Sequence, residues 1–371
     1  MSWLEWAEEE RAAIQALDRW REVRDFDAQG PVGRLAGGRH VVSFASNDYL
    51  GLSLHPAVLA AAHEALERWG CGAGSARLVV GSRPVHSQLE RELAAWKGCE
   101  AALIFPTGYA TNLGVLTALA GPGVRICSDA LNHASIVDGC RLSRAEVQVF
   151  RHLDLDDLES RMGPGPRTIV VTEAVFSMDG DVAPIAELAR LCRRAGALLV
   201  IDEAHQVIGD APDLDGGLVL RVGTLSKTLG SLGGFVAGPA SLIQLLVNRA
   251  RPFIFTTAPP PAAAAAALAA LRIVRSPEGE SLRRRLRTLV ERVKPGHPSP
   301  IVSFVMGEES AALKASRLLL ELGFLVPAIR PPTVPAATSR LRLSLSAAHT
   351  DDQLDRLLPA LGQLRTLRVP A

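Results

Sequence analysis

Short apolar runs alternate with helical segments along most of the chain, and this alternation constrains the fold more than any other feature. The apolar runs are typical of buried strands: Ala101–Phe105, Val124–Ser128, Thr168–Thr172, Leu198–Ile201 and Val219–Thr224. The helical segments between them are Ser87–Trp96, Asn112–Ala120 and Ile185–Ala195. The pattern predicts a doubly wound α/β domain, with a mostly parallel sheet covered by helices on both faces.

The two ends of the chain have other patterns. Residues 1–40 indicate one helix followed by a Gly/Pro-rich crossing over Gly30–Gly38. Beyond residue 240 we expect a helix beginning in the Pro259–Pro261 run, then the strands Val302–Val305, Leu325–Val326 and Leu341–Leu345, with a helix over Ala311–Leu322. The expected organisation is an N-terminal helical arm (1–45), a large α/β domain (46–240) and a smaller C-terminal α+β domain (241–371).

Composition excludes several classes of protein. The 371 residues are 48% hydrophobic, enough for a packed core, and their net charge of +1 gives no reason to expect nucleic-acid binding or affinity for an acidic membrane. The N-terminal sequence is acidic, unlike a secretory signal, and the apolar run Ala262–Ala270 is about half the ~20 residues of a membrane span. The five cysteines are widely spaced, which favours reduced thiols. We expect a cytoplasmic protein.

Asp202 and Lys227 carry the strongest chemical signal. Each follows an apolar strand, and ligands of open parallel sheets gather at the carboxyl ends of the strands. Both residues could be ordinary surface charges. The Asp-Glu-Ala-His run could belong to a helicase, but the chain lacks the GxxxxGK[ST] phosphate loop that this reading needs. The third interpretation is an imine-forming lysine with an acid that protonates a pyridine nitrogen, as in pyridoxal phosphate (PLP) enzymes.

A primary amine is scarce in this chain. The sequence contains four lysines, Lys97, Lys227, Lys294 and Lys314. Lys97 closes an expected helix, Lys294 lies in an expected loop and Lys314 in a helix of the tail, so we expect these three to be solvated charges. Lys227 is therefore the candidate for amine chemistry.

Three further segments could bind a phosphate, a planar ring or a carboxylate. Gly108 lies where a strand ends and a helix begins, so backbone N–H groups there could bind a phosphate, although most such turns bind nothing. His133 could stack on a planar ring or be an ordinary structural residue. Arg330 precedes a stiff proline segment and could bind a carboxylate, the alternative being a surface turn. The histidines lack zinc spacing, so no metal is expected.

The chain resembles the α-oxoamine synthases, which are fold-type I PLP enzymes. Within them it most closely resembles the biotin-synthesis branch that makes 8-amino-7-oxononanoate. The motifs that carry the resemblance are Ser46–Leu52, Gly74–Leu78, His133–Ser135, Thr172–Asp181, the Asp202/His205 and Thr224/Lys227 pairs, and Ala328–His349. The last segment distinguishes this branch from the glycine acetyltransferase, aminolevulinate and sphingoid-base branches.

The resemblance implies a role for individual residues. Lys227 would form the imine with the coenzyme, Asp202 would contact the pyridine nitrogen and His205 the phenolic oxygen, and His133 would stack on the ring. The residues implied to hold the phosphate are Gly108, Tyr109, Thr224 and, nearby, Ser177, with Thr256 reaching the phosphate of the neighbouring subunit in a homodimer with shared sites. Arg330 would hold the amino-acid carboxylate, Thr333 would belong to the substrate site, and Arg21 would meet the acyl thioester, with Arg19 and Arg24 as alternatives.

The implied reaction joins L-alanine to a pimeloyl thioester of coenzyme A or of an acyl carrier protein, with loss of carbon dioxide and thiol. Another α-oxoamine synthase, such as a glycine C-acetyltransferase, is the alternative.

One departure from the family pattern is the short, glycine-poor segment 206–212, which raises the further alternative of a non-enzymatic protein with the same fold.

Overall fold

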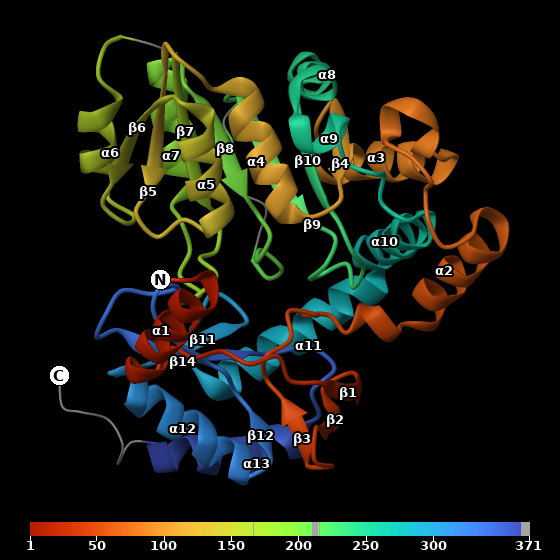
Figure 1. Cartoon of the computed structure of the whole chain (residues 1–371). Coiled ribbons are helices and arrows are strands. Elements are labelled where there is room, and N and C mark those ends of the chain that lie inside the picture. Colours follow the sequence, from red (N-terminus) through yellow and green to blue (C-terminus); the bar gives the residue numbers. More distant parts are fainter. Residues whose placement is uncertain (166, 210–213, 215, 365–371) are drawn as a thin grey trace. The chain divides into compact units, whose positions relative to one another are not determined.

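The computed structural model describes residues 1–165, 167–209, 214 and 216–364, and Figure 1 labels its elements. The chain divides into two compact units. Unit 1 contains Met1–Tyr49, Met178–Gly180 and the residues from Arg285 onward, and unit 2 contains Leu50–Ser177 and Asp181–Arg284.

Unit 2 contains a mostly parallel sheet. Its strands are β4 (Ala101–Phe105), β5 (Val124–Asp129), β6 (Glu146–Phe150), β7 (Arg167–Glu173), β8 (Leu198–Asp202), β9 (Val219–Thr224) and β10 (Gly234–Gly238). In the described part of the unit they lie in the order β4-β10-β9-β8-β7-β5-β6. Strands β5 to β9 run parallel, whereas β10 is antiparallel to both β4 and β9.

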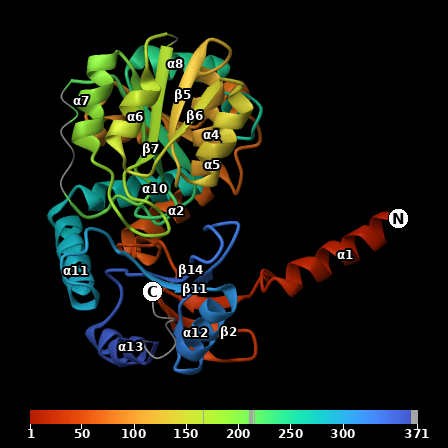
Figure 2. The ribbon, with the colours of Figure 1, turned by 90° about the vertical axis from the view of Figure 1, so that its left-hand side faces the viewer.

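Helices cover both faces of this sheet. Figure 2 shows α6 and α7 on one side of it and α4 and α5 on the other. The helices that lie in unit 2 or begin there are α2 (Pro56–Trp69), α3 (Pro84–Lys97), α4 (Gly108–Leu119), α5 (Ala134–Ser143), α6 (Leu155–Met162), α7 (Ile185–Ala195), α8 (Ala240–Arg249), α9 (Arg251–Ile254), α10 (Pro261–Val274) and α11 (Pro277–Val293). A 3₁₀ turn, Leu52–Leu54, and a π turn, Arg77–Gly81, complete it.

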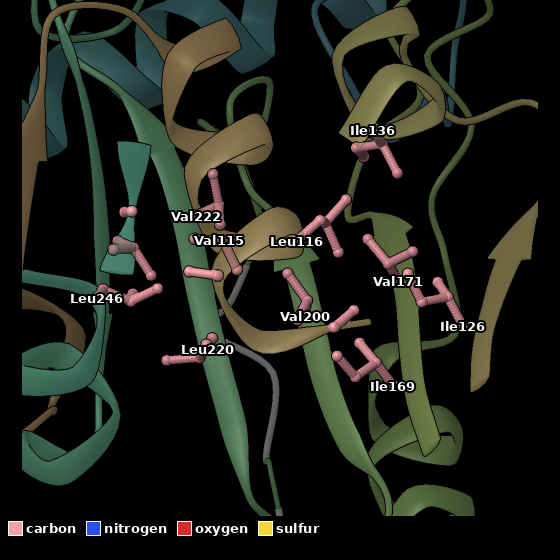
Figure 3. Packing of buried hydrophobic residues seen from close by; sticks show 14 of the residues in the cluster. Val115, Leu116, Ile126, Ile136, Ile169, Val171, Val200, Leu220, Val222 and Leu246 are labelled. Carbon is pink, nitrogen blue, oxygen red and sulfur yellow. The ribbon is translucent and has the colours of Figure 1, made fainter. Parts of the chain in front are cut away.

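The core follows the two-residue period of the strands. Ile169 and Val171 of β7 pack with Leu116 of α4 in one buried cluster, which Figure 3 shows from close by. Val170, between them, belongs to the cluster on the opposite face with Leu188 of α7. Since successive side chains of a strand point to opposite faces, an unbroken apolar run such as this one is what a sheet covered on both sides requires.

Unit 1 is built from both ends of the chain. Its elements are α1 (Trp3–Ala16), β1 (Phe26–Gln29), β2 (Val32–Leu35), β3 (His40–Ser43), β11 (Ile301–Gly307), α12 (Glu309–Glu321), β12 (Phe324–Leu325), β13 (Ala328–Ile329), β14 (Ser339–Ser344) and α13 (Asp351–Gln363). Among the described residues they form two small sheets, β1-β2-β3-β12 and β11-β14-β13. In the first sheet β3 pairs in parallel with β12, with Val42 opposite Phe324.

The expected strands of the large domain are confirmed, with β9 matching residue for residue, and so is the helix start in the proline run. The crossing expected over Gly30–Gly38 is instead largely an antiparallel meander: β1, β2 and β3 pair in succession, with Gly30 at the first turn. The division into units also differs from the expected boundary near residue 240. Helices α8 to α10 belong to unit 2, because α10 packs on α2 and α3 and α8 packs on α4 and β4.

No helix in the described ranges is both long and apolar enough to cross a membrane. The five cysteines are free thiols, three of them buried.

Candidate active site

Three polar residues end neighbouring parallel strands of unit 2. Glu173 is the last residue of β7, Asp202 the last of β8 and Thr224 the last of β9. Glu173 lies directly opposite Asp202 in the strand pairing, so the two carboxyl groups share one edge of the sheet. This is the edge at which ligands of open α/β sheets bind.

Lys227 and His205 are in contact at this edge. Lys227 follows β9 and His205 follows β8, and their side chains meet with Nζ 2.7 Å from Nε2. The structure therefore brings together the lysine and the histidine that the sequence singled out, beside the strand end that carries Asp202.

The Asp202 carboxylate is buried and held by two donors. The side-chain amide of Asn112 donates to Oδ2 at 2.7 Å, and the backbone N–H of Ala204 donates to Oδ1 at 2.9 Å. These two hydrogen bonds fix the orientation of the Asp202 carboxyl group at the end of β8.

His133 precedes α5 and caps its N-terminus. Its Nδ1 accepts from the backbone N–H of Ser135 at 3.2 Å and lies 2.7 Å from the Ser135 hydroxyl. The residue is partly exposed to solvent. Loss of solvent around part of the ring lowers the pKa of His133. The charge of Asp202 opposes this effect, and the charge of Lys227 adds to it. The net lowering of its pKa favours the neutral imidazole.

Glu173 is buried next to these charges. Burial raises its pKa to about 8, the nearby Asp202 charge adds to the rise, and Lys227 opposes it. Its Oε2 accepts the backbone N–H of Ser177 at 3.2 Å, while Oε1 has no hydrogen-bond partner among the described residues. At neutral pH Glu173 therefore holds a proton, and the Ser177 beside it is also buried.

The N-terminus of α4 lies at the turn where the sequence predicts phosphate binding. Thr107 caps the helix, and Gly108 is its first residue. A Cβ on Gly108 would lie 3.4 Å from Thr224 Cβ, so the helix start adjoins the end of β9. Gly234 of β10 closes the same turn, since a Cβ there would lie 2.6 Å from Gly108 Cα. Backbone N–H groups and the helix dipole favour an anion at such a place.

Tyr109 is exposed and lies near His133. The ring centroids are 6.4 Å apart with the planes nearly perpendicular, and the Tyr109 hydroxyl donates to Asp138 of α5. Thr256 is exposed between α9 and α10, and among the described residues it makes no hydrogen bond to the groups above.

Unit 1 brings together two of the predicted substrate residues. Arg330 donates to the backbone carbonyls of Asp18 and Trp20, and Arg21 donates to the carbonyl of Pro331 at 3.0 Å. Burial lowers the pKa of Arg330, and the neighbouring charge of Arg21 acts in the same direction. Thr333 is exposed three residues after Arg330. The two guanidinium groups thus form one basic surface.

The two alternatives to Arg21 have acidic partners. Arg19 donates through Nε and Nη2 to Oε1 of Glu309, at 3.1 and 2.9 Å. Arg24 is exposed, with Nη2 3.8 Å from Glu22. Arg21 makes its hydrogen bonds to carbonyl groups alone within the described part of the chain, which leaves its charge the least compensated.

One prediction about lysines is wrong. Lys97 is not a solvated charge: its ammonium is buried and paired with Glu203 at 2.7 Å, because the end of α3 packs against the sheet. Lys294 and Lys314 are exposed as expected. In the short segment 206–212, residues 210–212 lie outside the described residues.

Sequence reasoning missed Asn112, Ser135 and Glu173 as members of the site. Asn112 was placed only as the start of an expected helix, whereas α4 begins four residues earlier and buries it. A lone asparagine at the head of an otherwise apolar helix is a usable signal, since a buried amide needs partners.

These residues fit PLP. The α4 start offers N–H groups for a phosphate, Asp202 offers a buried, fixed carboxyl group for a pyridine nitrogen, and Lys227 is the amine at the same edge. The Oδ1 of Asn112 and the Oε1 of Glu173 are buried polar atoms without partners in the described structure, both beside Asp202. In the described ranges no cluster of His, Cys, Asp or Glu could hold a metal ion.

Comparison with known proteins agrees with this chemistry. The family model "Aminotransferase class I and II" matches residues 39–361. The 8-amino-7-oxononanoate synthase of Anaeromyxobacter dehalogenans is 48% identical over 97% of this chain and 95% of its own length. That of Alkalilimnicola ehrlichii is 49% identical over 95% and 96%.

Solved structures agree in fold. A serine palmitoyltransferase from S. paucimobilis with a bound PLP–myriocin aldimine has a TM-score of 0.92 and 31% identity over 99% of both chains. An 8-amino-7-oxononanoate synthase from Francisella tularensis has a TM-score of 0.74 and 26% identity over 88% of this chain and 98% of its own. The chain therefore belongs to the class I and II aminotransferase family, within the α-oxoamine synthase group of PLP enzymes.

Proposed function

We propose that this protein is an 8-amino-7-oxononanoate synthase of biotin biosynthesis, a PLP-dependent acyltransferase. It condenses L-alanine with a pimeloyl thioester, carried by coenzyme A or an acyl carrier protein, and releases carbon dioxide and the free thiol. The observation that carries the proposal is the contact between Lys227 and His205 at the strand edge of Asp202. Identity of 48% to 49% with curated relatives of that name, over nearly the full length, supports it.

PLP, when bound, supplies an electron-withdrawing ring that stabilises negative charge on the α-carbon of an amino acid. Lys227 would hold the coenzyme through its amine and, as a free amine, would move the α-proton of the amino acid. Asp202 keeps a proton on the pyridine nitrogen. The neighbouring Glu173, whose pKa is raised to about 8, would be protonated at neutral pH.

The other site residues of unit 2 bind and orient the coenzyme. Gly108 and Tyr109 offer backbone N–H groups to its phosphate, Thr224 adds a hydroxyl, and Ser177 lies nearby. His205 donates to the phenolic oxygen, and His133 stacks on the ring. Thr256 reaches the phosphate held by the neighbouring subunit of a homodimer with shared sites, in keeping with its exposure and its lack of hydrogen bonds to the described groups above.

The basic surface of unit 1 binds the substrates. Arg330 pairs with the alanine carboxylate, and Thr333 lies beside it. Arg21 contacts the acyl thioester, in preference to Arg19 and Arg24, because its charge is the least compensated of the three. The location we propose is the cytoplasm, in keeping with the biosynthetic enzymes that the chain resembles.

A second candidate is another α-oxoamine synthase, with glycine or serine as the amino acid. The fold likeness to a serine palmitoyltransferase favours it, since that TM-score, 0.92, exceeds the 0.74 found for the Francisella synthase. Sequence identity favours the first candidate, at 48% against 31%.

Product analysis separates the two candidates. The purified enzyme is loaded with PLP and offered alanine, glycine or serine, each with acetyl, pimeloyl or palmitoyl thioesters, and the products are identified by mass spectrometry. We expect 8-amino-7-oxononanoate from alanine and a pimeloyl thioester at the highest rate. Faster turnover of glycine with an acetyl thioester, or of serine with a palmitoyl thioester, contradicts the proposal.

A further inference from the structure

Four polar side chains of unit 2 form one continuous line of hydrogen bonds. The amide nitrogen of Asn112 lies 2.7 Å from Asp202 Oδ2 and 2.9 Å from the Ser135 hydroxyl. That hydroxyl lies 2.7 Å from Nδ1 of His133. The line thus connects the anion at the end of β8 with the imidazole at the start of α5.

The donors and acceptors along this line are determined by its ends. The Asp202 carboxylate and the Ser135 oxygen each accept one N–H of Asn112, which uses both protons of the amide. The backbone N–H of Ser135 donates to His133 Nδ1, so this nitrogen is an acceptor and carries no proton. The hydroxyl proton of Ser135 therefore also points at Nδ1, and His133 carries its single proton on Nε2.

The middle of the line is deeply buried. Asn112 is 2% exposed and Ser135 1% exposed, on the packed helices α4 and α5. Within the described structure, Oδ1 of Asn112 has no hydrogen-bond partner. A buried carbonyl oxygen without a hydrogen bond lowers the stability of the fold. In this arrangement Oδ1 is left without a partner, and both N–H donors of the amide point at Asp202 and Ser135.

We propose that Asn112 and Ser135 are positioning residues: together they fix the carboxylate of Asp202 and hold His133 as the neutral tautomer with its proton on Nε2. The part of this inference that concerns the coenzyme rests on the proposed function. A protonated His133 would place a cation next to Lys227 and against a ring whose nitrogen must itself stay protonated. The line prevents this, because a proton on Nδ1 would break both hydrogen bonds that Ser135 makes to it.

The first test uses the protein without coenzyme or substrate. Nitrogen-15 NMR of histidine-labelled apoprotein, with the His133 signal assigned through His133→Gln, reports its tautomer and pKa. We expect the Nε2–H tautomer in the wild type. Ser135→Ala should raise the pKa of His133 and mix its tautomers, and Ser135→Thr, which keeps the hydroxyl, should restore both.

The matched control is Ser143→Ala, a buried serine of the same helix whose hydroxyl donates to the carbonyl of Cys140. It should leave His133 unchanged. An unchanged tautomer and pKa in Ser135→Ala overturns the proposal. This result does not depend on which amino acid or thioester the enzyme uses, so it is distinct from a failure of the proposed function.

The second test uses the enzyme loaded with PLP. Asn112→Leu keeps the side-chain volume but removes both donors. We expect kcat to fall at least tenfold, KM for the amino acid to change less than threefold, and the pH midpoint of the coenzyme's visible absorbance to move. Thr117→Ala, on the same helix with its hydroxyl bonded to the Leu113 carbonyl, is the control. Wild-type kcat and an unmoved midpoint in Asn112→Leu overturn the proposal, and if this variant does not fold, the Ser135 variants decide it.

Discussion

The ammonium of Lys97 lies 2.7 Å from Oε2 of Glu203, and both side chains are almost completely buried. Arg221 completes the cluster, with Nε 2.7 Å from Oε1 of the same carboxylate. Glu203 directly follows Asp202, yet the two residues have different roles. Asp202 lies in the candidate active site, whereas Glu203 connects α3 to β9 through its ion pairs with Lys97 and Arg221.

Removing Glu203 should destabilise unit 2 strongly. Glu203→Ala leaves two buried cations without their anion, a change that costs about 3–5 kcal/mol in comparable cases. Chemical denaturation followed by circular dichroism measures the loss. Glu187→Ala breaks an exposed pair with Arg190 and should cost less than about 1 kcal/mol. Equal effects of the two substitutions would show that the buried cluster contributes no more than a surface pair.

Lys227→Ala should abolish the covalent attachment of PLP. Wild-type protein reduced with borohydride should carry the coenzyme on a single peptide containing residue 227, and the variant should carry none. Turnover should fall by about 1,000-fold or more, since nucleophile and proton carrier are lost together. Lys314→Ala, an exposed lysine, is the control. A reducible link that persists in Lys227→Ala assigns the amine to another residue.

Asp202→Asn should retain PLP but slow proton removal from alanine. A neutral amide cannot keep the pyridine nitrogen protonated, and loss of one partner of a buried ion pair corresponds to roughly 100-fold or more in rate. Exchange of the alanine α-proton for deuterium, followed by mass spectrometry, isolates this step. Asp156→Asn, at an exposed position of α6, should exchange at the wild-type rate. If Asp202→Asn exchanges the α-proton at the wild-type rate, Asp202 is not required for proton removal from alanine, and the prediction is wrong.

His152 should make stability depend on pH. Its ring lies 2.9 Å from Asp129 and 2.5 Å from Asp181, and although burial acts in the opposite direction, these two carboxylates raise its pKa from 6.5 to about 9. The folded state therefore binds the proton more tightly than the unfolded state. The stabilisation is complete below pH 6.5 and is lost as the pH rises through about 9.

The size of this contribution is on the order of 1–3 kcal/mol. Denaturation curves between pH 6 and 10 should show the decline in the wild type and a flatter profile in His152→Gln. His63→Gln, at a histidine of α2 outside this ion pair, serves as the control and should keep the wild-type slope. Identical slopes in wild type and His152→Gln would contradict the prediction.

Gly234→Ala should weaken coenzyme binding. A Cβ at this position would lie 2.4 Å from Thr111 Oγ1 and 2.6 Å from both Gly108 Cα and the Thr107 carbonyl, so the start of α4 must shift. We expect the dissociation constant for PLP to rise at least about tenfold, because phosphate binding depends on that helix start. Absorbance titration of the apoprotein measures it. Gly72→Ala, where a Cβ meets no atom within 4 Å, should bind normally.

The sequence predicted the parts of the fold that periodicity and proline determine. The apolar runs predicted five strands of the unit 2 sheet, and the Pro259–Pro261 run predicted the start of α10. Strand β10 was not predicted, because Gly234–Gly238 is short and contains glycine at both ends, features that usually weaken a strand. It forms nevertheless, because both of its edges are paired.

For the site, the sequence identified residues by their position after strands, and the structure added those that act through other side chains. Asp202 and Lys227 follow apolar runs, which any reader of the sequence can see. The contact of Asn112 with Asp202 spans 90 positions of the chain, and the pairing of Lys97 with Glu203 depends on how α3 packs. Local pattern contains no information about such distant partners.

The parallel pairing of β3 with β12 joins segments from opposite ends of the chain, with Val42 opposite Phe324. During synthesis on the ribosome, all of unit 2 is made before β12, so β3 can pair with β2 but not with β12 until the chain reaches residue 324. One edge of β3 is therefore exposed on the nascent chain, where it could pair with another chain, and a truncation that removes β3 should leave β12 without the strand it pairs with.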